Sequence, residues 1–336
     1  PFEQSAYIVQ NKDVEVLRES TAGGAFTAIA KYVIHNSGVV FGVELNKNLE
    51  AHHIYVEDVT ELKRFRNSKY VQSSVGGTLR KVKFFLEQGK TVCFSGTPCQ
   101  IEGLKCYLKK DYENLITVDV VCRAVPSPLI FRKYVELQKQ ELEDDIKTVR
   151  FRDKYYGYKY STMNVVTDRN HGNYHQGVES DPWLRAFFSN ICDRPSCHNC
   201  HFRNQYRVSD FTIWDCFHAG RFSKELDNDK GATRVLVHTD KGRRIFEAIK
   251  DDFSYVEVKP EEAVAGAKEM QESVKPHEQR QVFFEDANKL SGSQLFYKYF
   301  PSTFRVKAEH FVRMACYKMG IYSLAKKVFV RLTKKY

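Results

Sequence analysis

Strands and helices alternate along the first half of the chain, and this alternation limits the possible folds more than any other feature. From residue 20 to about residue 150, short runs rich in Val, Ile and Phe are separated by longer segments with helical spacing of apolar residues. Such alternation predicts a mostly parallel β-sheet flanked by helices. The expected strands are 6–9, 38–43, 91–95 and 115–121, and the expected helices are 24–35, 75–88, 98–109 and 128–140.

Three of these helices begin with residues that are typical of helix starts. They are Ser20-Thr21 before Gly23-Gly24, Thr97 before Pro98, and Ser127 before Pro128. The start of a helix presents free backbone N–H groups and the positive end of the helix dipole. It is therefore suited to a phosphate group or to a thiolate that holds a metal centre.

The second half of the chain changes in character. Residues 146–172 alternate aromatic and polar side chains, which predicts antiparallel strands inserted in or appended to the first domain. A helix at 182–189, a strand at 210–214, a helix at 241–250 and a strand at 255–258 are expected to follow. We therefore expect an α/β fold with an antiparallel portion and a helical tail, divided into a domain over 1–260, a charged connecting region over 261–300 and a basic amphipathic tail over 301–336.

The composition sets limits on the partners. With 336 residues, of which 42% are hydrophobic, the chain has ample material for a core, and it has no run of about 20 apolar residues that could span a membrane. Its 52 Lys and Arg residues against 42 Asp and Glu give a net charge of +10. This charge favours anionic partners such as nucleotide cofactors, acidic proteins or lipid headgroups, and we expect no nucleic-acid partner.

The nine cysteines point to a reducing compartment. Their number is odd, their spacing is irregular, and no apolar leader opens the sequence. This pattern argues against a framework of extracellular disulfides and predicts a cytoplasmic protein that keeps its thiols for metal binding or catalysis.

Two cysteines follow neighbouring strands of the expected sheet. Cys99 stands in Ser95-Gly96-Thr97-Pro98-Cys99-Gln100, and Cys122 stands ahead of Pro126-Ser127-Pro128. Because both come at the carboxyl ends of strands, where open α/β sheets bind ligands, we expect the two thiols to converge. By contrast, Cys93, Cys106 and Cys316 are interpreted as buried apolar thiols.

A second pair of cysteines lies in Cys197-His198-Asn199-Cys200. This short spacing lets both thiolates reach one centre, and with Cys99 and Cys122 they would complete a shell of four sulfurs for iron-sulfur or zinc. Spacing alone also permits a local zinc knuckle. That knuckle would use Cys192, Cys197, Cys200 and Cys216, or would include His198 or His201. Considered as a set, the cysteines favour a cluster over zinc.

Two further segments have the chemistry of a nucleotide site. The turn from Ser20 to Gly24 has small residues that allow a phosphate to approach the backbone, although a Gly pair at a helix start is often only a tight turn. The loop from Arg66 to Ser73 combines two cations, hydroxyl groups and the Tyr70 ring, which suit a phosphate and a flat ring system. The alternative interpretation of this loop is a solvated turn.

The tail has apolar residues on one helical face and basic residues on the remainder. The apolar set is Phe311, Val312, Ala315, Met319, Tyr322, Leu324, Val328, Phe329 and Leu332. The basic set is Arg305, Lys307, Arg313, Lys318, Lys326, Lys327, Arg331, Lys334 and Lys335. We favour helices that pack on the domain and leave a basic face in solvent. Peripheral contact with the inner surface of the membrane is the minority alternative.

Taken in order, the motifs resemble those of the coenzyme F420 hydrogenase/dehydrogenase beta-subunit family, in its short form without an N-terminal ferredoxin domain. The resemblance covers roughly residues 5–260. The segments that carry it are Ser20-Thr21-Ala22-Gly23-Gly24, Ser68-Lys69-Tyr70-Val71-Gln72-Ser73, Ser95-Gly96-Thr97-Pro98-Cys99-Gln100-Ile101, Cys122 with Pro126-Ser127-Pro128, Cys197-x-x-Cys200 and Ser209-Asp210-Phe211-Thr212.

The resemblance implies an α/β flavoprotein that holds FAD and a [4Fe-4S] cluster and passes electrons between the cluster and a hydride-accepting substrate or coenzyme F420. It makes Cys99, Cys122, Cys197 and Cys200 the cluster ligands. It makes the two nucleotide-site segments the flavin contacts, with Ser20, Thr21, Gly23, Gly24, Ser68, Lys69, Tyr70, Gln72 and Ser73 as the cofactor-binding residues. A separate ferredoxin-like carrier would supply the electrons.

The sequence also departs from the family pattern. Arg123-Ala124 stand where relatives have His-Gly, Asn67 stands where they have Gly, and Trp214-Asp215-Cys216-Phe217-His218 replaces a Gly-Asp-x-Trp-Gly signature. Short members of the family also occur among genes for surface polysaccharide synthesis. The substrate is therefore expected to be a small molecule or a glycan-linked one.

The leading hypothesis is thus an iron-sulfur flavoprotein oxidoreductase. A first alternative is a zinc-stabilised accessory or binding protein of a glycan pathway that has lost its flavin. A second is an electron-transfer subunit with no substrate of its own, which docks by its basic surface onto an acidic, ferredoxin-like partner.

Overall fold

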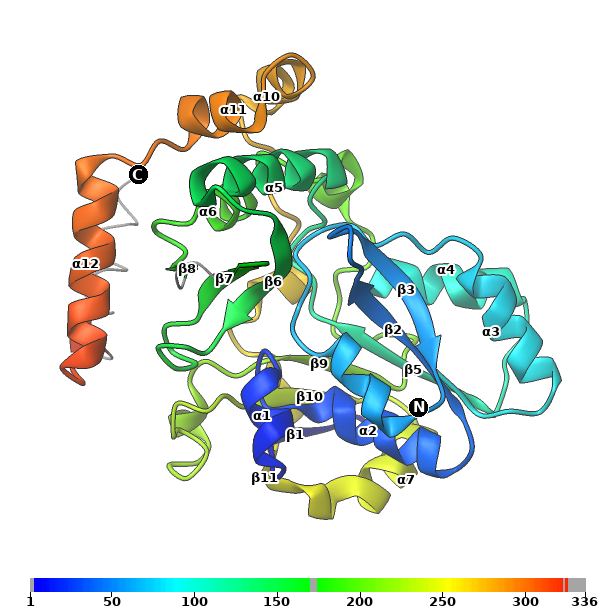
Figure 1. Cartoon of the computed structure of the whole chain (residues 1–336). Coiled ribbons are helices and arrows are strands. Elements are labelled where there is room, and N and C mark those ends of the chain that lie inside the picture. Colours follow the sequence, from blue (N-terminus) through cyan, green and yellow to red (C-terminus); the bar gives the residue numbers. More distant parts are fainter. Residues whose placement is uncertain (1–2, 170–173, 323, 326–336) are drawn as a thin grey trace. The chain divides into compact units, whose positions relative to one another are not determined.

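The computed structural model describes residues 3–169, 174–322 and 324–325, and its contacts divide the chain into two compact units (Figure 1). Unit 1 comprises residues 1–125 and 194–275, and unit 2 comprises residues 126–193 and 276–336. The chain therefore leaves unit 1 after Val125 and returns to it at Arg194. The sequence-based division at residues 260 and 300 stays a prediction.

Unit 1 is built on an eight-stranded sheet with the order β11-β1-β10-β9-β5-β4-β2-β3. Its strands are β1 (Ser5–Asn11), β2 (Val39–Leu45), β3 (Ala51–Val56), β4 (Val92–Gly96), β5 (Leu115–Val120), β9 (Phe211–Asp215), β10 (Thr233–Val237) and β11 (Phe253–Val258). The run β9-β5-β4-β2 in the middle is parallel. The pairs outside this run are antiparallel, so the sheet is mixed.

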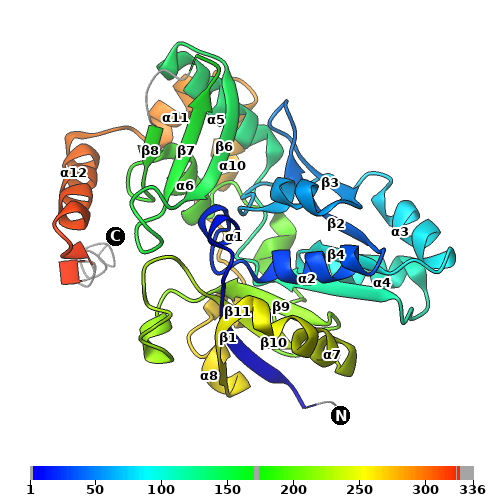
Figure 2. The ribbon, with the colours of Figure 1, turned by 60° about the horizontal axis from the view of Figure 1, so that its bottom comes forward.

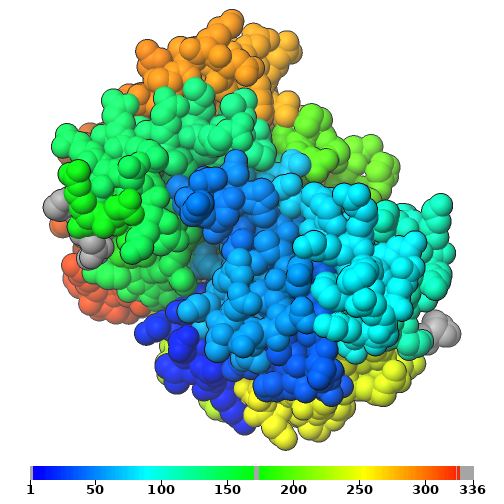
Figure 3. Space-filling model, turned by 45° about the vertical axis from the view of Figure 1, so that its right-hand side comes forward, coloured from blue at the N-terminus to red at the C-terminus, as the bar shows by residue number. Residues whose placement is uncertain are grey.

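The first strand of the chain is paired with two of the last strands of this unit. In β1, Val9 is opposite Thr233 of β10 on one side and Tyr255 of β11 on the other. The space-filling view shows the blue N-terminal segment beside the yellow segment near residue 250 (Figure 3). Closure of the sheet therefore depends on residues that lie more than two hundred positions apart.

Helices cover both faces of this sheet. They are α1 (Val14–Glu19), α2 (Ala25–His35), α3 (Thr78–Glu87), α4 (Pro98–Leu108), α7 (Asp240–Ile249), α8 (Pro260–Val264) and α9 (Lys268–Gln271), with the 3-10 turns η1 (Val59–Phe65), η2 (Pro195–Asn199), η3 (Ala219–Arg221) and η4 (Lys250–Asp252). Helices α2 and α7 lie side by side on one face of the sheet (Figure 2). Val40 and Ile116 belong to the core cluster that these two helices share. Helices α3 and α4 cover the opposite face, where Phe41 and Phe94 point.

This architecture confirms the expected α/β fold, and its helix starts follow from the sequence. At the start of α4, Thr97 forms a capping box with Gln100 ahead of Pro98. Helix α2 instead begins after Gly24, whose φ of 77° is left-handed and favours glycine. Both backbone arrangements orient the first turn of the helix toward the carboxyl edge of the sheet.

The antiparallel strands expected over 146–172 are present, but they form a separate three-stranded sheet in unit 2. Its elements are α5 (Pro128–Leu142), β6 (Ile146–Asp153), β7 (Thr162–Thr167), β8 (Tyr174–Gln176), α6 (Pro182–Phe188), α10 (Arg280–Ala287), α11 (Gly292–Tyr299) and α12 (Phe304–Lys318). Its core contains the fully buried rings of Phe131 and Trp183, whose centroids are 4.9 Å apart. The ring of Tyr134 packs beside them, and its hydroxyl donates to the buried carboxylate of Asp181 at 2.8 Å.

The tail confirms one expectation and corrects another. Helix α12 forms where a helix was expected, but Phe311 and Met319 of its apolar face are exposed instead of packed on the domain. The expected continuation through Val328, Phe329, Leu332 and the basic residues after Ala325 lies outside the described residues. The described helices do not include one with the length and hydropathy of a membrane span.

Candidate functional site

Cys99 and Cys122 follow adjacent parallel strands. Strands β4 and β5 pair in register, with Gly96 opposite Asp119, so both chains leave the sheet at the same edge. Cys99 lies in the first turn of α4, where its Sγ is 3.1 Å from the hydroxyl oxygen of Thr97. Cys122 stands two residues beyond the end of β5. The topology thus brings these two thiols to one edge, as the sequence predicts.

Cys197 and Cys200 lie on and just after the short turn η2, which two sets of contacts tie to the segment after β5. The backbone N–H of Arg194 donates to the carbonyl of Val125 at 2.9 Å. The guanidinium of Arg203 donates to the carbonyl oxygens of Arg123 and Glu269. These bonds place the Cys-x-x-Cys segment beside the segment that carries Cys122.

The four sulfurs share one electrostatic environment. Burial, together with the neighbouring thiols of Cys197, Cys99 and Cys200, raises the pKa of the Cys122 thiol to about 12, and the Arg203 guanidinium acts in the opposite direction. All four thiols are half-buried. Cys122 therefore interacts electrostatically with cysteines from two other segments of unit 1, and the Arg203 guanidinium offsets part of their effect.

The arrangement is not that of a site for one ion. Within the part of the chain that the structure describes, no three His, Cys, Asp or Glu side chains are placed to hold a single metal ion. The four cysteines of the zinc knuckle that the spacing permitted do not lie together either. Cys216 is buried in an apolar cluster with Ile8 and Leu226, and the charged neighbours of Cys192 are Asp193 and Arg280.

The remaining cysteines confirm two expectations and correct a third. Cys93 is fully buried in β4, and burial raises its pKa well above the usual range. Cys316 is also buried. Cys106, expected to be buried, is exposed, because α4 turns this position away from the sheet and packs Ile101 and Leu104 inward instead.

The two segments expected to contact a flavin are linked to each other and to the cysteine edge. The backbone N–H of Ser68 donates to the hydroxyl of Thr21 at 2.7 Å, and the two hydroxyl groups are 3.1 Å apart. At the other end of the loop, the Gln100 amide donates to the hydroxyl of Ser73 at 3.0 Å. Gln100 directly follows Cys99, so hydrogen bonds at the two ends of the loop connect it to the turn and to the cysteine edge.

Several of these residues also stabilise the local fold. Adding a Cβ to Gly23 would place it 2.2 Å from the Val9 carbonyl oxygen, so the turn packs directly on strand β1. The ammonium of Lys69 donates to the carbonyls of Arg64 and Arg66 at 3.1 and 2.9 Å. Asn67, where relatives have glycine, has a left-handed φ of 69°. Ser20 is buried, and Tyr70 and Gln72 are half-buried.

Sequence reasoning assigned no role to Arg203, Gln100 and Ser273, which form hydrogen bonds within or beside the cysteine segments. The hydroxyl of Ser273 accepts a hydrogen bond from the Cys200 backbone N–H at 2.9 Å. Arg203 comes three residues after Cys200, and Gln100 comes one residue after Cys99. Their closeness to a cysteine in the sequence could therefore have identified these two residues. Ser273 is far from any of these cysteines in the sequence, so no such signal pointed to it.

The chain has been compared with known proteins. The family described as the C-terminal part of the beta subunit of coenzyme F420 hydrogenase/dehydrogenase matches residues 89–264, just over half of the chain. The chain belongs to this family. The matched region contains all four clustered cysteines, whereas the Ser20–Gly24 turn and the Ser68–Ser73 loop precede it. The resemblance stated from the motifs is thus confirmed, and family membership implies an oxidoreductase of the F420 hydrogenase type.

One similar solved structure is a chain of the F420-reducing [NiFe] hydrogenase complex from Methanosarcina barkeri, studied as a xenon derivative. The two chains are 15% identical, with a TM-score of 0.50, and the match covers 90% of this chain and 94% of the other. At this identity the likeness shows a shared fold. A search among curated protein sequences finds no match.

Proposed function

We propose that this F420 hydrogenase beta-subunit relative is a flavoprotein oxidoreductase that holds FAD beside a [4Fe-4S] cluster. Cys99, Cys122, Cys197 and Cys200 are the proposed cluster ligands. The Ser20–Gly24 turn and the Ser68–Ser73 loop are the proposed flavin site. When bound, these groups would supply hydride transfer at the flavin and single-electron transfer at the cluster.

The observation that supports this proposal is that the other three cysteines are electrostatic neighbours of Cys122. Together, these four residues come from three separate segments. Four thiolates are the donor set that iron-sulfur clusters take. In a cubane each thiolate binds a different iron, so the sulfurs surround the cluster and are not gathered at bonding distance from one ion. The residues present therefore fit the proposed group.

The surrounding residues would orient the sulfurs and offset their charge. Deprotonation of four neighbouring thiols in a half-buried site is costly without compensating positive charge. Arg203 provides one such charge, and its bonds to two backbone carbonyls hold it there. The bond from the Cys200 N–H to Ser273 restricts the orientation of that ligand. Such outer contacts tune a metal centre as much as its ligands do.

The flavin segments would be kept next to the cluster by Gln100. Its amide oxygen accepts a hydrogen bond from the Thr97 N–H at 2.9 Å, while its amide nitrogen donates to Ser73. One side chain thus connects the helix start that bears Cys99 with the proposed flavin loop. A flavin held by this loop would be positioned close to the cysteine edge, which suits electron transfer between the two groups.

We propose that a separate protein carries the electrons. The net charge of +10 suits an acidic, ferredoxin-like carrier. The structurally similar chain from Methanosarcina barkeri is part of a hydrogenase complex, and this supports a role among protein partners. The hydride partner is proposed to be coenzyme F420 or a small or glycan-linked substrate.

Purification without oxygen tests the cluster. We expect a brown protein with iron and acid-labile sulfide, and the cluster is lost when Cys99→Ser or Cys197→Ala removes a ligand. Cys106→Ala is the matched control, because this exposed thiol on α4 lies outside the proposed ligand set. The proposal fails if the protein is colourless with stoichiometric zinc, or if the Cys106 variant loses iron as the Cys99 variant does.

A second pair of variants tests the flavin site separately. Ser73→Ala removes the acceptor of the Gln100 amide, so we expect bound FAD to fall severalfold while the iron content is retained. Ser74→Ala, at the exposed neighbouring position, should leave both unchanged. Equal FAD content in the two variants would contradict the assignment of this loop. Reduction of the bound flavin by reduced coenzyme F420 tests that hydride partner, and a lack of reduction would exclude it.

A further inference from the structure

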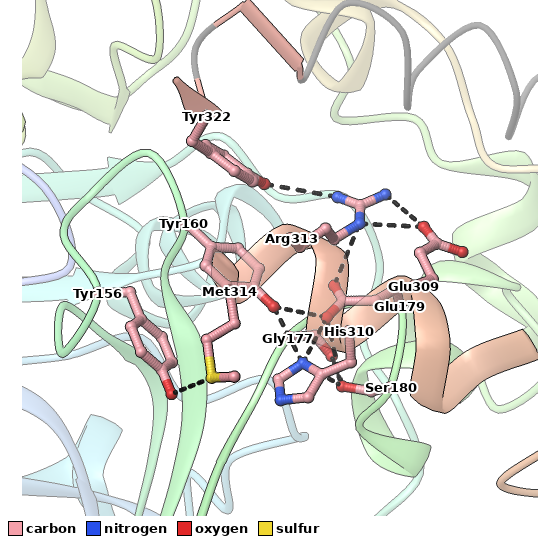
Figure 4. Close-up of polar contacts among 10 residues, drawn as sticks. All are labelled: Tyr156, Tyr160, Gly177, Glu179, Ser180, Glu309, His310, Arg313, Met314 and Tyr322. Atoms are coloured by element: carbon pink, nitrogen blue, oxygen red, sulfur yellow. Dashed lines mark hydrogen bonds and ion pairs between the residues drawn. The ribbon is translucent and has the colours of Figure 1, made fainter. Parts of the chain in front are cut away.

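Helix α12 is attached to unit 2 through polar side chains. The carboxylate of Glu179, 3% exposed, accepts a hydrogen bond from Tyr160 at 2.7 Å and lies 2.9 Å from Nδ1 of His310 (Figure 4). The guanidinium of Arg313 lies 3.8 Å from the same carboxylate and binds Glu309 on its own helix. The inner side of this helix is thus charged and aromatic, where most surface helices are apolar.

The opposite side of α12 is apolar and exposed. The exposed fractions are 88% for Phe304, 63% for Phe311, 43% for Val312 and 64% for Met319. These positions are separated by intervals of seven and eight residues, so they align along one side of the helix, with Ala308 and Ala315 between them. An aligned group of large exposed apolar side chains indicates a surface that binds another protein or a membrane.

Basic residues border this apolar side on both edges. At 3.6 residues per turn, the exposed Arg305 lies along one edge, and Lys307 and Lys318 lie along the other. The single carboxylate of the helix, that of Glu309, binds Arg313 on the inner side. After Glu309 the sequence has no Asp or Glu, but it has seven Lys and Arg residues.

We propose that α12 lies flat on an anionic membrane surface, with its apolar side among the lipid chains and its basic edges against the headgroups. Lysine and arginine stems extend along apolar surface and place their charges at the level of the headgroups. A second copy of this chain is a poorer occupant, because a two-fold pairing of this face would bring the basic edges of the two copies together. This inference is independent of the redox proposal.

Flotation of the full-length protein with lipid vesicles tests this inference. We expect it to float with vesicles of phosphatidylcholine and phosphatidylglycerol, but not with phosphatidylcholine alone. Raised ionic strength should weaken the binding, because salt screens the basic edges. Lack of flotation with anionic vesicles, or equal flotation with both kinds, would overturn the proposal.

Variants separate the apolar contribution from the basic one. The double variant Phe304→Ser/Phe311→Ser should bind anionic vesicles at least about tenfold more weakly, since even partial burial of two Phe side chains accounts for that factor. Val282→Ser is the control, since Val282 is an apolar residue with 51% exposure on α10 of the same unit. Lys307→Gln/Lys318→Gln should weaken the preference for anionic lipid, because Arg305 on the other edge retains its charge.

The same variants test whether the apolar side of α12 binds a second copy of this chain instead of a membrane. Light scattering measures the mass of the protein, and circular dichroism confirms that each variant is folded. A concentration-dependent dimer that Phe304→Ser/Phe311→Ser dissociates, with no flotation of the wild type, would assign this face to self-association and overturn the membrane proposal. Equal vesicle binding by the wild type and this double variant would overturn it as well.

Discussion

Replacing Glu179 with Gln should release α12 from unit 2 without unfolding the rest of that unit. The substitution keeps the shape of the side chain but removes the charge that His310, Tyr160 and Arg313 surround. Hydrogen bonds to charged groups contribute about 1.5–3 kcal/mol each. Arg313 retains Glu309 as a partner, so we expect a net local loss of about 3 kcal/mol.

Amide hydrogen exchange measures this loss directly. A change of about 3 kcal/mol in local opening corresponds to roughly hundredfold faster exchange of the amides in α12. Amides of β6 and β7, in the core sheet of the same unit, should keep their protection. Glu309→Gln is the matched control, because it removes the other carboxylate that binds Arg313. That carboxylate is partly exposed, so about 0.5 kcal/mol is expected.

Two results would refute this reasoning. Unchanged exchange in α12 of the Glu179 variant would show that packing, and not the buried carboxylate, holds the helix. Equal acceleration in α12 and in β6 would show that Glu179 supports the whole unit. An effect of Glu309→Gln as large as that of Glu179→Gln would also contradict the assignment of the anchor to the buried residue.

The same anchor predicts a response to acid. Burial raises the pKa of Glu179, but the hydrogen bonds from His310 and Tyr160 and the charge of Arg313 outweigh burial and leave the pKa below its usual value of 4.5. A carboxyl group with a lowered pKa stabilises the folded state above that usual value. The contribution should disappear as the pH falls through the lowered pKa. Exchange in α12 should therefore accelerate below about pH 4.5 in the wild type but not in Glu179→Gln.

Two further predictions concern the stability of unit 1. Gly23→Ala should destabilise it by about 3 kcal/mol in urea unfolding, because the added Cβ would meet the backbone of Val9. Gly103→Ala in α4 meets no atom within 4 Å and should instead stabilise by about 0.5–1 kcal/mol, so equal effects would contradict the packing argument. His238 is buried between Gln4 and Thr212, and burial followed by the charge of Arg207 lowers its pKa from 6.5 to about 4. The neutral His238 side chain should contribute fully to the free energy of unfolding above pH 6.5. That free energy should decline by up to about 3 kcal/mol as the pH falls toward 4. Urea titrations measure this decline, which should be smaller in His238→Asn.

The sequence predicts most elements of residues 25–142, because their signals are local, but it does not predict strand β3 over Ala51–Val56. Strands β4 and β5 are short apolar runs, and α4 and α5 begin with Thr-Pro and Ser-Pro. Helices α8 and α9 were not predicted, because five and four residues are too few to show helical periodicity. The pairing of β1 between β10 and β11 has no local signal, since its partners are more than two hundred residues away.

In the candidate site, too, features with a local sequence signal could be predicted, and contacts between distant residues could not. Cys99 and Cys122 follow parallel strands and Cys197-x-x-Cys200 is a local motif, so their convergence could be predicted from the sequence. The contribution of Arg203 could not, because its bonds to the Arg123 and Glu269 carbonyls are formed by folding alone. The periodicity of α12 predicts its apolar side but not which side meets the protein, since the ion pair of Arg313 with Glu179 is non-local.

The route of the chain through the two units affects the order of events during synthesis. Cys99 and Cys122 leave the ribosome before the whole excursion over residues 126–193, and Cys197 and Cys200 follow it. The contacts at Glu269 and Ser273 come later still. Strand β1 precedes both of its sheet partners, β10 and β11, by more than two hundred residues and pairs with them only after they have been made. Cys99 and Cys122 are therefore synthesised long before the segments that surround them in the fold, and a metal centre at the proposed site would be inserted after translation has passed residue 273.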